Sequence, residues 1–467
     1  MSRNTILWFD LETFGLNPKY DRIAQAAWIR TDMDLKKLEE GKVLYCKLSP
    51  DYLPNPESCL ITHITPQEAN EKGICEADFA RKLHKELMVP GTIATGYNNV
   101  HFDDEAIRTL LYRNLYDPYE REWGEGRSRW DIINLVRATC DLRPGGLTFT
   151  TLNPETNAPS FKLTDLTAEN NIEQTGAHDA LVDVEATIAM ARLIKEKQPQ
   201  LYRWAFTHRQ KRQITEVIDV ERHMPFLSTQ TAFVSEKGNT HPLLPLFYDP
   251  DKPNTLYCFD LLRDIPDTAK GDYKETGIFR LQINRMPFVA PLSTLTPDCE
   301  ERLGFTKKWV MDRASEAMFQ KVLTEDSILE AREPYEKTGN DPDLGLYDSF
   351  VTVHDKGVLR SVRDLRPEEK LSAGEHYFDD TKYHKLLWRQ VARNWPGALS
   401  EKDQKAWKSF CGLRLTAPPV DTALTYDMYS RTVEEKIQSL DTSQTDRNVL
   451  LALRDYGQEL YDKVLKV

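Results

Sequence analysis

Two acidic residues follow an apolar strand near the start of the sequence. Thr5–Phe9 is predicted to be a strand, and Asp10 and Glu12 come directly after it with one residue between them. In extended backbone, alternate side chains point to the same face, so the two carboxylates lie side by side. Two neighbouring anions repel unless a cation lies between them. Taken alone, this pair is also compatible with a solvated strand end, so a metal site needs further ligands.

A second group of acids opens a predicted helix. The predicted strand Thr92–Tyr97 runs into an Asn-rich turn, and Asp103, Asp104 and Glu105 follow it. Acids at a helix N-terminus are favoured by the helix dipole, which accounts for Asp104 and Glu105 without any function. Asp103 is the member of this group that we expect to act as a ligand.

A histidine and an aspartate mark the start of a third helix. His178 precedes a helix predicted from Asp179 to about Lys197, and Asp183 interrupts the apolar residues of that helix. A carboxylate in such surroundings is costly unless it is paired or bound to metal. Imidazole titrates near neutral pH, so His178 beside these acids is the candidate general base.

Together these acids predict a metal-dependent phosphodiester hydrolase. Asp10, Glu12, Asp103 and Asp183 can gather around two divalent cations roughly 4 Å apart, which activate a water and stabilise the attacking and departing oxygens at phosphorus. Hard oxygen ligands favour Mg²⁺, with Mn²⁺ as a substitute, over zinc.

The elements that must position these residues divide the chain into three regions. Up to residue 198, strand-like runs alternate with helical patterns, which indicates a mixed α/β sheet domain. Residues 199–343 contain short β-like runs between Pro, Gly, Asn and Asp, which indicates a small β-rich domain. Residues 344–467 have apolar residues at helical spacing. Further expected strands are Ala24–Thr31, Lys42–Leu48, Ala232–Ser235, Leu256–Asp260 and Gly277–Ile283, and expected helices are Glu105–Tyr116, Ser128–Cys140, Lys382–Asn394, Tyr426–Leu440 and Arg447–Leu465.

The composition limits the kind of protein that this can be. A formal net charge of −12 argues against a protein that coats nucleic acid, so any nucleic-acid surface must be a local basic groove. No run approaches the roughly 20 apolar residues of a membrane helix, and Asp10 and Glu12 occupy the place of a signal peptide's apolar region, so we expect a cytoplasmic protein. The seven cysteines are widely scattered and include no C-x-x-C pair. This predicts reduced, mostly structural thiols rather than a zinc site or a disulfide framework.

The three acidic segments resemble the motifs of the DEDD exonucleases. D-x-E at Asp10, N-x₃-F-D ending at Asp103 and H-x₄-D ending at Asp183 are all present, and the last spacing is that of the DEDDh subfamily. A resemblance to the bacterial exonuclease I family covers nearly the whole chain. The segments that carry it are Asp10–Gly15, Leu60–Ala69, Gly96–Val100, Tyr112–Asn114, Ser128–Asp131 and Phe206–Arg209.

The resemblance implies an architecture and an activity. It implies a ribonuclease H-like α/β exonuclease domain (residues 1–198), an SH3-like β-rich domain (199–343) and an all-α C-terminal domain (344–467), arranged as a C-shaped monomer around single-stranded DNA. The implied reaction is processive 3′→5′ hydrolysis of single-stranded DNA to 5′-mononucleotides, with a role in DNA repair and recombination.

The resemblance also implies which residues hold the DNA. Single-stranded DNA suits cations interleaved with aromatic rings. Lys162 departs from the family, which has arginine at this position, so a bidentate phosphate contact would become a point-charge contact. The implied partner is the acidic C-terminal tail of single-stranded DNA-binding protein, in a basic pocket near Arg143 and Trp204. The implied substrate-binding residues are Glu12, Arg108, Tyr119, Trp123, Arg137, Arg143, Phe161 and Lys162.

Two other functions stay open. An RNA-directed DEDDh exonuclease, such as an oligoribonuclease or ribonuclease T, carries the same catalytic residues but lacks the long C-terminal extension. A non-catalytic nucleic-acid scaffold would ordinarily have lost an acid or the histidine, whereas all five residues are present here.

Overall fold

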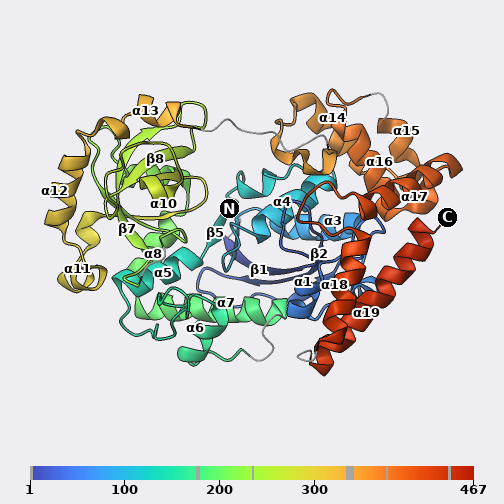
Figure 1. Cartoon of the computed structure of the whole chain (residues 1–467), viewed down its shortest axis with the longest axis horizontal. Helices are drawn as coiled ribbons and strands as arrows, with labels where there is room; N and C mark the ends of the chain where they lie inside the picture. Colours follow the sequence, from blue (N-terminus) through green and yellow to red (C-terminus); the bar gives the residue numbers. More distant parts are fainter. Residues whose placement is uncertain are drawn as a thin grey trace.

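The amino-terminal domain is built on a five-stranded mixed sheet with the strand order β3-β2-β1-β4-β5. The computed structural model describes residues 4–174, 179–233, 236–332, 341–374, 377–439 and 443–466. β1 pairs antiparallel with β2 and parallel with β4, so it is the central strand (Figure 1). The strands are β1 (Thr5–Thr13), β2 (Ile23–Thr31), β3 (Lys42–Tyr45), β4 (Thr92–Gly96) and β5 (Ser128–Asp131).

Helices cover both faces of this sheet. α7 packs across β1 and β2 on one face, and α3 and α4 cover the other (Figure 1). Ile6 and Trp8 of β1 pack in the same core as α7, whereas Leu7 and Phe9 pack with α3 and α4. The helices are α1 (Pro56–Thr62), α2 (Pro66–Lys72), α3 (Glu76–Leu87), α4 (Asp103–Arg113), α5 (Ile133–Leu142), α6 (Leu163–Glu169) and α7 (Ala180–Lys197).

The segment Ser128–Cys140, predicted as one helix, is strand β5 followed by helix α5, so that prediction was wrong for its first residues. All four residues of β5 are buried, and Asp131 pairs with Gly96 of β4. Trp130 packs edge-on against aromatic rings of helix α8 (Pro199–Thr207). A buried edge strand of four residues has no alternation that could distinguish it from the helix that follows.

The second region is a five-stranded antiparallel sheet with the order β10-β6-β7-β8-β9. The predicted strands at Leu256–Asp260 and Gly277–Ile283 are confirmed within one residue. The strand expected at Ala232–Ser235 was misplaced: β6 lies earlier, Ala232 is in a turn, and residues 234–235 lie outside the described residues. The elements are α8 (Pro199–Thr207), α9 (Lys211–Val217), β6 (Phe226–Thr229), β7 (Thr240–Tyr248), β8 (Thr255–Asp260), α10 (Tyr273–Thr276), β9 (Ile278–Gln282), β10 (Phe288–Pro291), α11 (Pro297–Leu303), α12 (Lys307–Ala317) and α13 (Glu325–Glu330).

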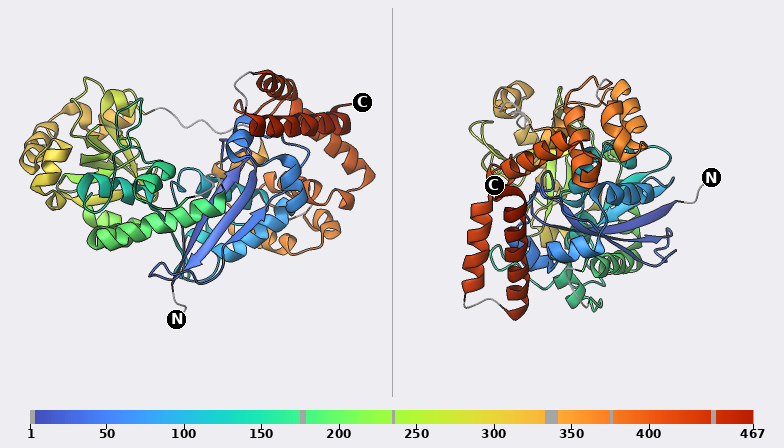
Figure 2. Two further views of the ribbon diagram at one scale, coloured as in Figure 1. Left: turned by 90° about the horizontal axis from the view of Figure 1, so that it is seen from below. Right: turned by 90° about the vertical axis from the view of Figure 1, so that its right-hand side faces the viewer.

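The third region is helical and packs against the first. Leu386 and Leu450 share a core with Phe14 and Tyr52 of the first region. The second and third regions lie on opposite sides of the first, and α18 and α19 run side by side (Figure 2). No helix within the described ranges is long and apolar enough to cross a membrane. The elements are the 3₁₀ helix η4 (Pro342–Tyr347), α14 (Val353–Arg363), α15 (Pro367–Gly374), α16 (Lys382–Asn394), α17 (Glu401–Thr416), α18 (Tyr426–Gln438) and α19 (Gln444–Leu460).

Candidate active site

Three of the predicted acids meet where β1 faces α7. Because side chains alternate along β1, Asp10 and Glu12 continue the face of Ile6 and Trp8, which is the face that α7 covers. Asp183 lies in the first turn of α7. One carboxylate oxygen from each of these three acids lies within 4.8 Å of the others. The structure therefore brings together acids that are 171 residues apart in the sequence, from Glu12 to Asp183.

The fourth acid reaches the same strand from the opposite helix layer. Asp103 is the first residue of α4 and is 7% exposed. Its Oδ1 accepts a hydrogen bond of 3.2 Å from the backbone N–H of Leu11, the residue between Asp10 and Glu12. All four predicted acids therefore lie around the same end of β1.

The turn between β4 and α4 is fixed by a carboxylate that the sequence analysis missed. Asp131, at the end of β5, accepts hydrogen bonds from the backbone N–H groups of Asn98 (2.9 Å) and Val100 (3.1 Å). Gly96 begins this turn, and a Cβ there would lie 2.7 Å from the carbonyl oxygen of Phe9 on β1. The available signal was an acid at the end of a buried strand, next to the Asn-rich turn.

A second residue that the sequence analysis missed orients Asp183. The side-chain amide of Gln174 donates a hydrogen bond of 2.6 Å to Asp183 Oδ1. His178, the predicted general base, lies outside the described residues, between Gln174 and the start of α7. Its assignment stays a prediction.

The crowded acids hold protons more strongly than usual. Burial, followed by the negative charge of Asp103, raises the pKa of Asp10 well above its usual range. Burial and Asp183 raise the pKa of Glu12 to about 8, and burial and Asp104 raise that of Asp103 to about 8. Within the described residues, no Lys or Arg pairs with Asp10, Glu12 or Asp103. Oxygen ligands with uncompensated charge fit a divalent cation.

Replacing Glu12 with Gln should stabilise the protein in a chelator at alkaline pH. A carboxyl whose pKa is about 8 in the folded state and 4.5 otherwise destabilises the fold as pH rises through that window, because the unfolded chain releases its proton first. In EDTA we therefore expect the wild-type Tm to fall more steeply than that of Glu12→Gln between pH 5 and pH 8.5, by about 1 °C per kcal/mol relieved in a chain of this length. Differential scanning fluorimetry measures this, and parallel curves would contradict it.

Added Mg²⁺ supplies the matched control for this measurement. Mg²⁺ should raise the wild-type Tm at pH 8.5 and raise that of Glu12→Gln less, because the variant lacks one ligand charge. An equal rise in both proteins would show that the ion binds elsewhere.

Arg108 and Tyr119 form one of two cation–ring pairs among the predicted DNA-binding residues. The guanidinium of Arg108 lies 5.3 Å from the centre of the Tyr119 ring. Its Nε and Nη2 donate to Glu122 at 2.7 and 2.8 Å, and its Nη1 donates to Glu105 at 2.6 Å. Two carboxylates thus neutralise Arg108, which leaves it little free charge for a phosphate.

Arg137 and Phe161 form the other pair, and here the cation lacks a carboxylate. The guanidinium of Arg137 lies 5.4 Å from the centre of the Phe161 ring and donates to Thr231 Oγ1 at 2.7 Å. Burial lowers the pKa of Arg137. No Asp or Glu among the described residues forms an ion pair with it. A buried guanidinium without a carboxylate suits a phosphate.

The remaining predicted contacts differ in exposure. Trp123 is 62% exposed and Lys162 is exposed at the start of α6, so both are free to meet DNA. Arg143 donates to the carbonyl of Thr294 at 2.9 Å, and Trp204 Nε1 donates to that of Val289 at 2.8 Å.

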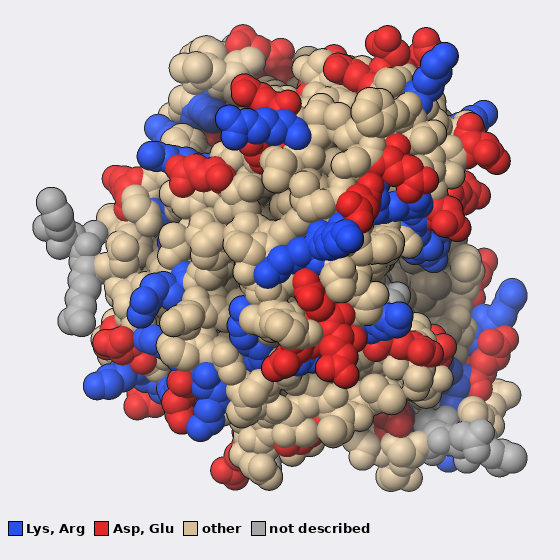
Figure 3. Space-filling view, turned by 90° about the vertical axis from the view of Figure 1, so that its left-hand side faces the viewer, with Lys and Arg blue, Asp and Glu red and all other residues tan. Residues whose placement is uncertain are grey.

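Arg143 of the first domain thus contacts the second, and Trp204 of the second domain lines a hollow with Trp130 and Leu135 of the first, so both lie at the boundary between these domains. The hollow beside Trp204 has a volume of only about 10 Å³, too small for a peptide side chain. On the outer face of the second domain, basic and acidic side chains are interspersed (Figure 3). A concentrated basic surface is thus absent from that face of the described structure.

Fold and site together define a metal-dependent exonuclease with a mixed sheet, an SH3-like domain and a helical C-terminal domain. Residues 7–191 match the family described as Exonuclease, residues 209–328 the Exonuclease I SH3-like domain, and residues 340–460 the Exonuclease I C-terminal domain. Exodeoxyribonuclease I of Escherichia coli K12 is 39% identical over 429 residues, covering 87% of this chain and 88% of the relative. The chain belongs to the exodeoxyribonuclease I family.

Solved structures agree with this family over nearly the full length. E. coli exonuclease I in complex with a dA16 oligonucleotide has a TM-score of 0.91 and 36% identity, covering 98% of this chain and 100% of that one. A structure of SSB/Exonuclease I in complex with an inhibitor has a TM-score of 0.90 and 35% identity, with the same coverage.

Proposed function

We propose that the protein is a processive 3′→5′ exonuclease that hydrolyses single-stranded DNA to 5′-mononucleotides, and that it serves DNA repair and recombination. The observation that carries the proposal is the convergence of four acids at one end of β1. The dA16 oligonucleotide bound by the E. coli relative supports single-stranded DNA as the substrate.

Asp10, Glu12, Asp103 and Asp183 would hold two Mg²⁺ ions. For Asp10, Glu12 and Asp103, the raised pKa values and the absence of a Lys or Arg partner among the described residues support this role. When bound, such cations supply an activated water and stabilise the charge that develops on the phosphate. Gln174 keeps Asp183 oriented, and Asp131 keeps the turn before Asp103 in place.

His178 would act as general base. The H-x₄-D spacing supports it, since His178 comes shortly before Asp183 in the sequence. Proton removal from the attacking water is the step that the four acids, as ligands, do not perform themselves.

Arg137, Phe161, Trp123 and Lys162 would hold the DNA. Arg137 offers a guanidinium to a phosphate, Phe161 and Trp123 offer rings for stacking, and Lys162 offers a point charge. Tyr119, Arg108 and Arg143 are proposed to line the same path. Arg108 would contribute mainly by packing against the ring of Tyr119.

The acidic tail of single-stranded DNA-binding protein is the proposed partner, at Arg143 and Trp204. The solved SSB/Exonuclease I structure supports this partner. The hollow beside Trp204 does not accommodate a peptide side chain in this structure.

Digestion of labelled nucleic acids tests the proposal. A single-stranded DNA labelled at its 5′ end, a matching RNA and a duplex are incubated with Mg²⁺ or with EDTA. We expect Mg²⁺-dependent shortening of the DNA from its 3′ end, with RNA and duplex spared. Preferential loss of RNA would favour an RNA-directed exonuclease, and binding without cleavage would favour a scaffold.

A further inference from the structure

A chain of alternating charges lies behind the candidate active site. Asp104, the residue after Asp103, is fully buried and accepts hydrogen bonds from Arg121 (2.7 Å) and Arg129 (2.8 Å). Arg129 pairs in turn with Glu122 at 2.9 Å. Asp104 is therefore a structural partner of arginines rather than a free acid.

The same chain continues to Glu105 in the first turn of α4. Glu122 binds Arg108 at 2.7 Å, and Arg108 binds Glu105 at 2.6 Å. The charges alternate in sign from Asp104 to Glu105, and every member is at most 10% exposed at its side chain. The cost of removing such charges from water offsets much of their mutual attraction, so the pairs are weak evidence for a large gain in stability.

Glu105 is also where the other two domains reach α4. Tyr347, the last residue of η4 in the C-terminal domain, donates a hydrogen bond from its hydroxyl to Glu105 Oε2. Arg285, in the turn between β9 and β10 of the SH3-like domain, pairs with Glu105 Oε1 at 3.7 Å. The carboxylate of Glu105, which is 4% exposed, thus contacts all three domains.

Neighbouring contacts support both attachments. Tyr112, at the other end of α4, donates to the carbonyl of Pro342 in η4 at 2.9 Å. Arg129 donates to the carbonyl of Asn284, next to Arg285, at 3.4 Å. Each of the two flanking domains therefore contacts α4 or its charge chain at two points.

We infer that Glu105 is a positioning residue, which uses the SH3-like and C-terminal domains to hold the first turn of α4, and with it Asp103, in register with β1. The expected effect of Glu105 on turnover rests on the proposed function. Its effect on the mobility of α4 is independent of any activity, because the contacts of Glu105 are made with other side chains of the protein.

The first test is amide hydrogen exchange in the metal-free protein. Glu105→Gln keeps the size of the side chain but loses the charge that Arg108 and Arg285 share. We expect exchange in the first turn of α4 to accelerate by about tenfold, and Tyr347→Phe, in a different domain, to accelerate the same amides. Unchanged exchange in α4 for both variants would overturn the inference.

The matched control is Glu120→Gln. Glu120 also pairs across to the C-terminal domain, with Arg360 at 3.5 Å, but it does not belong to the charge chain. It should leave exchange in α4 unchanged. Acceleration in this variant would mean that any loosening of the domain contact suffices, which would also overturn a specific role for Glu105.

Kinetics on single-stranded DNA give the second test. Glu105→Gln should lower kcat by about tenfold, raise the Mg²⁺ concentration needed for half-maximal rate and leave KM within about twofold, as for residues that orient metal ligands. Adding Tyr347→Phe to it should lower kcat little further. If the Tm falls while kcat and the Mg²⁺ requirement stay unchanged, the inference is overturned. If the wild-type protein cleaves no DNA, the proposed function is wrong, and the exchange experiment alone then decides the inference.

Discussion

Asp183→Asn is expected to lower kcat on single-stranded DNA by at least about 10³-fold, equivalent to about 4 kcal/mol of transition-state stabilisation, while Kd for the DNA changes little. The reason is that Asp183 supplies one of three oxygens that lie within 4.8 Å of each other. Asparagine keeps the side-chain size and can still accept the hydrogen bond of Gln174. The fall in kcat therefore measures the effect of removing the negative charge. Single-turnover rates and fluorescence anisotropy measure the two quantities.

Glu185→Gln is the matched control for this prediction. Glu185 lies on the same helix, two residues later, and pairs at the surface with Lys37. An exposed pair of this kind contributes little, so kcat and Tm should match the wild type. Turnover by Asp183→Asn within about tenfold of the wild type would remove Asp183 from the metal site.

The clustering of the acids could be predicted from the sequence because their placement depends on local rules. Alternation along a strand puts Asp10 and Glu12 on one face, and an acid among the apolar residues of a helix marks Asp183. The three-domain order followed from changes in periodicity. The signal for Asp103 was weaker, since dipole effects explain an acid in the first turn of any helix.

Other features could not be predicted, because they depend on partners far along the chain. Asp104 and Glu105 look alike in the sequence, yet Asp104 pairs with arginines 17 and 25 residues later, whereas Glu105 reaches Tyr347, 242 residues away. The residue type and the family resemblance predicted that Arg108 contacts DNA. In the structure its guanidinium donates hydrogen bonds to the carboxylates of Glu122 and Glu105.

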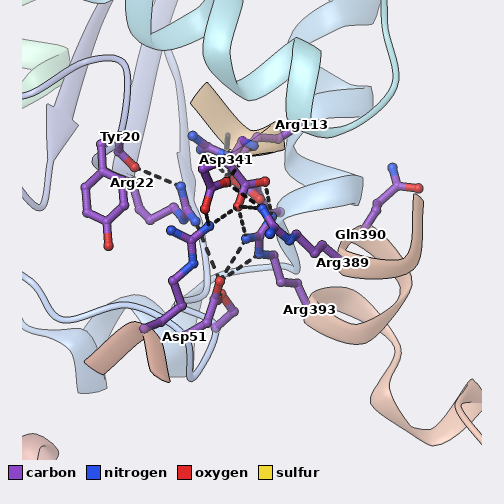
Figure 4. Close-up of polar contacts among 12 residues, drawn as sticks. Tyr20, Arg22, Asp51, Arg113, Asp341, Arg389, Gln390 and Arg393 are labelled. Atoms are coloured by element: carbon purple, nitrogen blue, oxygen red, sulfur yellow. Dashed lines mark hydrogen bonds and ion pairs between the residues drawn. The ribbon is translucent and has the colours of Figure 1, made fainter. Parts of the chain in front are cut away.

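The contact between the first and third domains contains a second network that the sequence does not reveal. Arg389 and Arg393 point from α16 toward Asp51 and Asp341 (Figure 4). Arg393 donates to Asp51 of the first domain at 2.8 Å and to Asp343 of η4 at 2.6 Å. The guanidinium of Arg393 therefore links acids of two domains. In the same way, Glu105 links two cations and a hydroxyl that come from three domains.

Asp343→Ala is expected to destabilise the protein by about 3–5 kcal/mol, because it leaves buried guanidiniums without their shared carboxylate. Asp343 is 3% exposed and accepts from Arg393, Arg389 (2.9 Å) and Arg414 (2.7 Å). These arginines outweigh burial and hold the pKa of Asp343 well below its usual range. Urea unfolding followed by circular dichroism measures the loss.

The pH dependence and a control separate this charge effect from a general loss of packing. Because the pKa of Asp343 is lowered on folding, its contribution is complete above about pH 4, the value of a free aspartate, and declines as pH falls below that. The difference between wild type and Asp343→Ala should therefore be constant from pH 5 to pH 8 and shrink in stronger acid. Asp364→Ala, which removes an exposed partner of Arg363 in the same domain, should cost less than about 0.5 kcal/mol. A loss for Asp343→Ala as small as that of the control would mean that the arginines find water or other acceptors, and that the domain contact rests on its apolar core alone.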